Sequence, residues 1–300
     1  MSPKHIILTL LLILCPIGMA AQSTITRHKP KPAVTKPKPA AKPKAKPKTK
    51  PAPRRNSTHH SSSTSSTVNL SAELNKLINN MVYVSGGTFT MGGTSEQGSD
   101  AESIEKPTHS VTLSSYYICK YEVTQALWRA VMGSNPSKFK GDNLPVEQVS
   151  WTDCQTFINR LNSYTGRNFR LPTEAEWEFA ARGGNYSRHY KYSGSNYISD
   201  VAWYCDNSGN RTHPVGTKQA NELGLYDMSG NVWEWCSDWY GSYSSYSQSN
   251  PTGATSGFGR VERGGNWCGL ARYCCSSHRS YYAPGNSFDD LGLRLVLSQL

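Results

Sequence analysis

Two carboxylates, Asp227 and Glu234, lie in an aromatic segment, residues 223–240, whose sequence is LGLYDMSGNVWEWCSDWY. The three tryptophans of this segment favour burial, and a buried carboxylate needs a cation or hydrogen-bond donors. The two side chains and the backbone carbonyls of Gly230 and Val232 are hard oxygen donors within eight residues, a ligand set that suits Ca²⁺. The alternative is that both carboxylates accept backbone N–H groups or pair with arginines.

Cysteines are the second group of residues with possible chemistry. The sequence has eight, and seven remain once a signal peptide that contains Cys15 is removed. In an exported protein some of the seven should form disulfide bonds. Because the number is odd, at least one thiol stays reduced, binds a metal or pairs outside the chain. No CxxC pair lies at zinc spacing from another, so we expect no structural zinc site.

Seven motifs follow one another in order between Met81 and Val296. They are MVYVSGGTFTMG at 81–92, YEVT at 121–124, PVEQVSW at 145–151, RLPTEAEWEFAARG at 170–183, GLYDMSGNVWEW at 224–235, RVERGGNW at 260–267 and LGLRLV at 291–296. In this order they resemble the formylglycine-generating enzyme family, also called the sulfatase-modifying factor domain. The resemblance implies a single α+β domain with a loop-rich, C-type-lectin-like fold.

The resemblance also implies a chemistry, in which two cysteines bind Cu(I) and O₂ oxidises a cysteine of a sulfatase peptide to formylglycine. Thiolates suit Cu(I) because both are soft. In this chain Cys274 falls at the position of the second active cysteine, whereas the first position is Gly269. Cys268 lies one residue too early, and Asn266 replaces the serine that normally follows Gly-Gly.

This shift in register leaves three interpretations of Cys268 and Cys274. The loop between them could bulge and restore a copper site, Cys268 could form a disulfide bond, or the thiols could be buried and inert. The departures from the family pattern favour a non-catalytic binding or structural member of the family. The alternative is a copper-dependent oxidase that converts a sulfatase cysteine to formylglycine.

Calcium is implied by the resemblance as well as by the donor set. The four candidate ligands of the aromatic segment match the family's second calcium site position by position, with Asp227 in place of an asparagine. For the family's first calcium site, Asp200 and Val201 would supply the opening ligands, but Asn207 and Gly209 match poorly. We therefore expect Ca²⁺ at the second site only.

The start of the chain predicts export. Residues 1–21 combine a basic start, the apolar run Ile6 to Leu14 and a small-residue exit, which is typical of a signal peptide. The run is too short to span a bilayer, so we expect no transmembrane segment in the mature chain and a location in the periplasm, at the cell surface or outside the cell. Residues 22–70 predict a disordered linker, Lys/Pro-rich and then Ser/Thr-rich, and residues 71–300 the family domain.

The net charge of +11 belongs to the N-terminal part of the chain. Residues 1–80 hold 14 of the 32 Lys and Arg residues and one of the 21 acidic residues, which leaves 18 basic and 20 acidic residues in 81–300. A nearly neutral domain argues against a nucleic-acid partner. The cationic linker could contact anionic surfaces, and a protein or peptide is the partner class that we expect for a non-catalytic domain.

Helices are predicted where a capping residue precedes an apolar face and a glycine follows it. The acidic residues Glu174, Glu176 and Glu178 suit the N-terminal end of one such helix, and we expect them to stabilise it rather than to catalyse a reaction. The predicted helices are residues 71–81, residues 124–133, a helix that begins at Ser150 or Thr152, and residues 173–183.

Alternating apolar residues predict two strands, at 82–91 and 109–117, and a polar loop at 96–106 lies between them. Gly86 and Gly87 predict a turn or bulge within the first strand. Beyond Gly184 the sequence is rich in Gly, Asn, Ser and Tyr, so we expect long loops on short strands.

Overall fold

The computed structural model describes residues 62–298, with side chains from residue 69 onward. The predicted signal peptide, residues 1–21, and residues 22–61 of the predicted linker lie outside the described residues. None of the helices in the described part of the chain has the length and hydrophobicity that a membrane span requires.

Three small β-sheets carry the fold. The first is antiparallel throughout, in the order β1-β4-β11-β5, so that the final strand of the chain lies inside the sheet. Its strands are β1 (Met81–Val84), β4 (Tyr116–Cys119), β5 (Phe169–Arg170) and β11 (Val296–Leu297). Both ends of the domain therefore meet in one sheet.

The second sheet contains the aromatic segment. Its order is β10-β6-β8-β9, and β6 pairs in parallel with β10 and antiparallel with β8. Its strands are β6 (Trp233–Trp239), β8 (Arg260–Arg263), β9 (Arg279–Tyr282) and β10 (Leu291–Leu293). The register places Gly292 of β10 opposite Glu234 of β6, which brings the end of the chain beside the aromatic segment.

The third sheet has the order β2-β3-β7. Its strands are β2 (Gly87–Met91), β3 (His109–Leu113) and β7 (Gln248–Ser249). The segments predicted as single strands, 82–91 and 109–117, are each divided between the first and third sheets. Gly86 marks the first division, because a Cβ atom there would lie 2.5 Å from the carbonyl oxygen of Leu113, which no larger residue can tolerate.

The helices begin and end largely where local signals predict. The hydroxyl groups of Thr124, Ser150 and Thr173 accept hydrogen bonds from backbone N–H groups three residues later, as N-caps do. The helices are α1 (Ser62–Asn79), α2 (Gln125–Met132), α3 (Trp151–Thr165), α4 (Glu174–Ala181) and α5 (Ile198–Val201).

Two predicted boundaries differ from the structure. Helix α1 begins at Ser62 rather than Ser71, because its first turns are Ser/Thr-rich and carry no apolar stripe that a sequence pattern could detect. The polar loop predicted at 96–106 contains two 3₁₀ helices, η1 (Ser95–Asp100) and η2 (Ser103–Glu105). Two further 3₁₀ turns are η3 (Gly184–Tyr186) and η4 (Ala271–Cys274).

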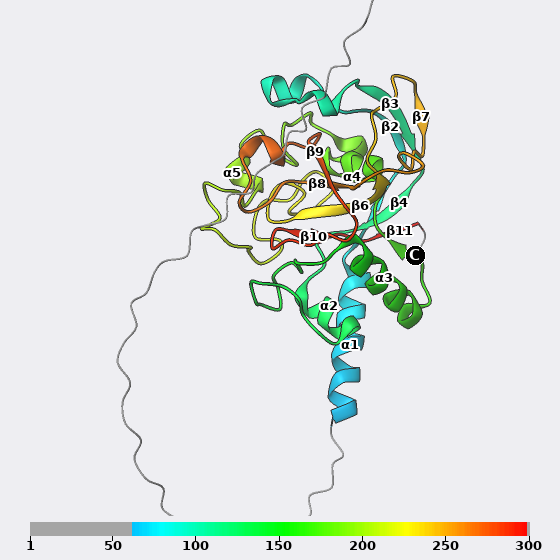
Figure 1. Ribbon diagram of the computed structural model, residues 1–300, viewed down its shortest axis with the longest axis vertical. Helices are drawn as coiled ribbons and strands as arrows, with labels where there is room; N and C mark the ends of the chain where they lie inside the picture. Colours follow the sequence, from blue (N-terminus) through cyan, green and yellow to red (C-terminus); the bar gives the residue numbers. More distant parts are fainter. Residues whose placement is uncertain (1–61, 299–300) are drawn as a thin grey trace, which may run out of the picture. The chain divides into compact units, whose positions relative to one another are not determined.

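Helix α4 holds the sheets together. Figure 1 shows α1, α2 and α3 gathered on the side away from the third sheet, while α4 packs against β2, β3, β6 and β8. Every residue of α4 is buried, including its three glutamates. The loop-rich α+β class that the sequence predicts is confirmed, and its centre is a helix whose acidic side chains must all find partners inside the protein.

Candidate functional site

Glu234 on β6 is completely buried and fully hydrogen-bonded. Arg294, just beyond β10, donates from Nη2 to Oε1 at 2.7 Å and from Nε to both carboxylate oxygens at 3.1 and 3.0 Å. The indole Nε1 of Trp177 on α4 donates to Oε2 at 2.7 Å. The parallel register of β6 and β10 makes this ion pair, since it places Arg294 two residues past the position opposite Glu234.

Asp227 lies in the turn before β6, with φ of 59°, and is also buried. Its Oδ2 accepts a hydrogen bond from the backbone N–H of Gly216 at 2.7 Å. Burial raises the pKa of Asp227 to about 6, although the Gly216 N–H opposes that shift. Asp227 therefore accepts a hydrogen bond from a backbone N–H group, and Glu234 forms an ion pair with an arginine. This is the arrangement expected under the alternative to a calcium site.

A third carboxylate, Glu122, completes this cluster and was not found from the sequence. It is 2% exposed, and its oxygens accept hydrogen bonds from Asn231 Nδ2 at 2.7 Å and from the backbone N–H of Val232 at 3.1 Å. Burial raises the pKa of Glu122 well above its ordinary value, and the charges of Asp227 and Glu234 raise it further. Its place in the YEVT motif gives no local sign of these distant partners.

The calcium ligands predicted from the sequence are thus only partly available in this arrangement. Asp227 Oδ2 already accepts the Gly216 N–H, and Glu234 fits as a ligand only if Arg294 releases it. Within residues 69–298, no three side chains of His, Cys, Asp or Glu converge as metal ligands. Calcium at this segment stays a prediction.

The two candidate copper ligands lie in different surroundings. Cys274 is completely buried in a small cluster with Tyr192, Val201 and Cys275, and this burial raises the pKa of its thiol far above the ordinary range. Cys268 is exposed, and its Sγ donates to Asp290 Oδ2 at 3.6 Å. No disulfide bond joins the cysteines within residues 69–298. A Cu(I) site needs two reachable thiolates, so the residues as placed do not fit the metal.

The three glutamates of α4 are counter-ions for buried and half-buried arginines. Arg279 of β9 binds Glu174 with two parallel hydrogen bonds of 2.7 Å, Nε to Oε1 and Nη2 to Oε2. Glu178 accepts from Arg182 at 2.9 Å and from Arg263 of β8, and these two arginines lower its pKa despite complete burial. Glu174 and Glu178 therefore connect α4 to the second sheet, and Glu176 pairs with Arg170 of β5, in the first sheet, at 2.6 Å.

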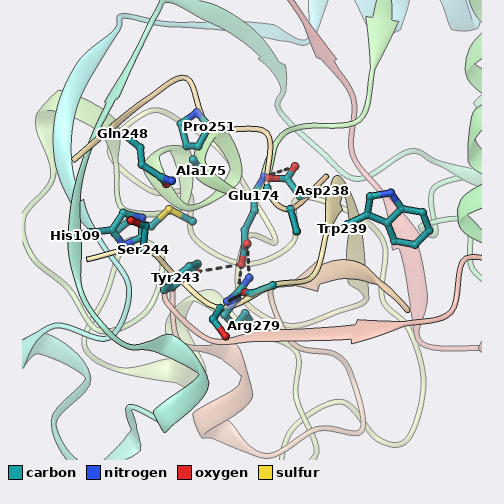
Figure 2. Close-up of a pocket in the computed structure, with 15 residues that line it drawn as sticks. His109, Glu174, Ala175, Asp238, Trp239, Tyr243, Ser244, Gln248, Pro251 and Arg279 are labelled. Carbon is teal, nitrogen blue, oxygen red and sulfur yellow. Dashed lines mark hydrogen bonds and ion pairs between the residues drawn. The ribbon is translucent and has the colours of Figure 1, made fainter. Parts of the chain in front are cut away.

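Next to this network is a small cavity of about 150 Å³ with a mixed polar and apolar lining, shown in Figure 2. Glu174 and Arg279 lie at its centre, and Tyr243 donates to Glu174 Oε1 at 3.1 Å. Asp238 lines the same cavity, and its Oδ2 accepts from the backbone N–H of Glu174 at 3.1 Å. Burial raises the pKa of Asp238 to about 7, and the Glu174 charge adds to this effect.

A larger cavity, of about 380 Å³, lies beside α1 and is called the α1 cavity below. Residues of α1, of α2, of the 119–124 segment and of the 214–217 loop line it. Glu122 is among the lining residues, so this cavity adjoins the buried carboxylate cluster.

The sequence profile of the sulfatase-modifying factor enzyme 1-like domain matches residues 67–299. The chain belongs to this family. The chaperone protein LppX of Paenibacillus barcinonensis is 36% identical over 74% of this chain and 90% of its own length. The formylglycine-generating enzyme of Mus musculus is also 36% identical, over 59% of this chain, and the chain spans 50% of that enzyme's length.

Solved structures agree with this family membership. Treponema denticola variable protein 1 superposes with a TM-score of 0.67 at 35% identity, over 73% of this chain and 95% of that protein. PvdO from Pseudomonas aeruginosa superposes with a TM-score of 0.64 at 26% identity, over 73% of this chain and 94% of that protein. The family and the α+β fold predicted from the ordered motifs are therefore both confirmed.

Proposed function

We propose that this protein is an exported, non-catalytic member of the sulfatase-modifying factor family that binds a protein or peptide partner. The burial of Cys274 carries the proposal. A copper oxidase of this kind needs a thiolate that can reach both metal and substrate, and Cys274 is a neutral, completely buried thiol.

The position of Gly265 supports the same conclusion. Its φ is 76°, and a Cβ atom there would lie 2.7 Å from Cys274 Sγ and 2.9 Å from the Tyr273 carbonyl carbon. The glycine thus lets the backbone close over the thiol. Moving Cys274 into a pair with the exposed Cys268 would require this packed turn to open.

The names of similar proteins support a binding role. LppX is named as a chaperone protein. Chlamydial relatives at 29–30% identity are named as serine/threonine-protein kinases, and this chain covers 38% of the length of each. Proteins named for different functions therefore share this type of domain. By analogy with LppX, we propose that the domain of this chain binds a polypeptide. The cationic linker would contact anionic surfaces.

A Cu(I) titration of the reduced protein, combined with a time-resolved count of reactive thiols, tests this proposal. We expect Cys268 to react with a maleimide first and Cys274 to react only after unfolding, with no stoichiometric high-affinity Cu(I) binding. The variant Cys268→Ser should remove the fast thiol, and Cys274→Ser should leave it unchanged. Cys154, which is buried in α3, provides a matched slow-reacting control through Cys154→Ser.

Tight binding of one Cu(I) that is lost in both Cys268→Ser and Cys274→Ser would overturn the proposal. So would conversion of a cysteine in a sulfatase peptide to an aldehyde by the wild-type protein under O₂. Either result would establish the copper-dependent oxidase as the function.

A further inference from the structure

We propose that the aromatic surface around Arg260 binds a polypeptide segment through a carboxylate group of that segment. This surface is called the Arg260 patch and consists of Arg260 with Trp151, Trp239 and Tyr282. The proposal rests on the proposed function, binding of a polypeptide, and adds the surface and the chemistry of the partner. Its basis is a fixed, solvent-accessible cation that forms no ion pair with a carboxylate of residues 69–298.

The guanidinium group of Arg260 lies between two indole rings. Its Cζ atom is 4.1 Å from the ring centroid of Trp151 on α3 and 3.7 Å from that of Trp239 on β6. Trp151 is itself fixed, because its Nε1 donates a hydrogen bond to the carbonyl oxygen of Cys236 at 3.0 Å. The two cation–π contacts hold the planar group in one orientation, so little side-chain entropy is lost when a ligand binds.

The Arg260 patch is open to solvent, since each of its four residues is half-buried. The register of β8 with β9 places Tyr282 opposite Arg260, on the same face of the second sheet. Figure 2 shows the indole of Trp239 directed away from the buried pair of Glu174 and Arg279. None of the four residues lines the α1 cavity, and only Trp239 lines the smaller cavity, so the patch is a surface of its own.

Arg260 has charge and hydrogen-bonding capacity that the protein does not use. Nη1 donates to the carbonyl oxygen of Ser237, whereas Nε is buried without an acceptor. Burial lowers the pKa of Arg260, but an arginine remains ionised at neutral pH. A carboxylate placed against the solvent side of the group would accept a charge-assisted hydrogen bond and neutralise the cation.

The charges around Arg260 favour a carboxylate over a phosphate group. Phosphorylated segments are typically bound by clusters of arginines. Among the described residues, Asp238 is the one charged group that shifts the pKa of Arg260, and its carboxylate accepts hydrogen bonds from the Ser237 hydroxyl and the Glu174 backbone N–H. No second cation is therefore in place to hold a doubly charged anion.

The surroundings of the patch suit an apolar contact beside the charge. Residues 239–259, which lead into β8, contain no Lys, Arg, Asp or Glu. Protein interfaces are depleted in charged residues at their centre, and Trp, Tyr and Arg supply most of their binding energy. A polypeptide segment offers both parts of the matching chemistry, a carboxylate and neighbouring apolar side chains.

Isothermal titration of blocked tripeptides into the full chain tests the proposal. The probe has the sequence leucine-glutamate-leucine, and its matched probes carry glutamine or lysine in place of glutamate. We expect saturable binding of one glutamate peptide and at least about tenfold weaker binding of the other two, because only a carboxylate forms charge-assisted hydrogen bonds with arginine. The basic residues before residue 62 are the same in every variant, so their contribution cancels when variants are compared.

Arg260→Gln should weaken binding of the glutamate peptide by at least about tenfold and leave the affinity for the glutamine peptide unchanged. Arg272→Gln is the matched control, with no expected change, since Arg272 stacks on Tyr273 at 4.7 Å but already pairs with Glu102 at 3.5 Å. Arg260→Lys keeps a cation between the rings and serves if Arg260→Gln fails to fold. It loses the planar fork, so binding should weaken about threefold to tenfold.

Equal affinity for the glutamate and glutamine peptides would overturn the proposal, as would wild-type affinity in folded Arg260→Gln or Arg260→Lys. Hexanoate separates a free carboxylate from a peptide: weaker binding than the tripeptide supports a polypeptide partner, and binding at least as tight overturns it. Failure of every peptide to bind would overturn the assignment of this surface. The copper titration and thiol count decide separately whether the domain is non-catalytic, so the two failures are distinguishable.

Discussion

Replacing Arg294 with methionine tests the central feature of the buried site. Methionine keeps most of the side-chain volume but leaves the Glu234 carboxylate, which is completely buried, without a cation. The substitution also removes hydrogen bonds from Arg294 to the carbonyl oxygens of Cys119 at 2.9 Å and Tyr226 at 2.8 Å. The perturbation is therefore one broken buried ion pair and two lost donors.

The expected cost follows from these contacts. Breaking a buried ion pair by removing one partner costs about 3–5 kcal/mol. Each lost hydrogen bond to a carbonyl oxygen adds about 1 kcal/mol. We therefore expect Arg294→Met to lower the free energy of unfolding by about 5–7 kcal/mol, a large part of the roughly 5–15 kcal/mol that a typical domain has.

Urea unfolding followed by tryptophan fluorescence measures this loss, and Trp177, whose indole contacts Glu234, serves as a nearby probe. The control is Arg129→Met, which breaks the Arg129–Asp142 pair of 2.9 Å, whose side chains are 40% and 67% exposed. That variant should lose less than about 1 kcal/mol. The double variant Arg294→Met with Glu234→Gln should recover at least about 2 kcal/mol, because no buried charge is then left unpaired. An Arg294→Met cost no larger than that of Arg129→Met would refute this account of the site.

Two further predictions concern the buried carboxylates. If calcium binds Asp227 with the Gly230 and Val232 carbonyls, added Ca²⁺ should raise the melting temperature of chelator-treated protein, and Asp227→Ala, which removes the side-chain oxygens, should remove the increase. Identical melting curves with calcium and with chelator would mean that protein donors alone satisfy these groups. The pKa of Asp238 is raised from 3.8 to about 7, so its stabilising contribution is present below about pH 4 and is lost as pH rises through about 7. The stability of the wild type should therefore fall relative to Asp238→Asn between about pH 4 and pH 7, and parallel urea-unfolding profiles for the two proteins would contradict this.

Helix boundaries in this protein follow from the sequence because they depend on residues close together in the chain. The hydroxyl groups of Thr124, Ser150 and Thr173 each cap a backbone N–H only three residues away. Glycines with positive φ end two of these helices, at Gly133 and Gly166. Such contacts form whatever the rest of the fold does, so a local pattern is sufficient to predict them.

The ordered motifs likewise identified the family and its α+β class. They did not reveal that the predicted strands at 82–91 and 109–117 are divided between two sheets. That division depends on which strands lie alongside, and Gly86 is required there only because Leu113, 27 residues later, approaches it closely.

The partners of the charged residues were decided by the tertiary structure alone. Glu234 and Arg294 are 60 positions apart, and Glu174 and Arg279 are 105 positions apart. The sequence determined that buried acids here need partners, because burying a charge in an apolar interior is costly for any fold. Which arginine pairs with which acid depends on the register of β6 with β10 and on the packing of α4 against β8. These contacts join distant segments, so no local sequence pattern encodes them.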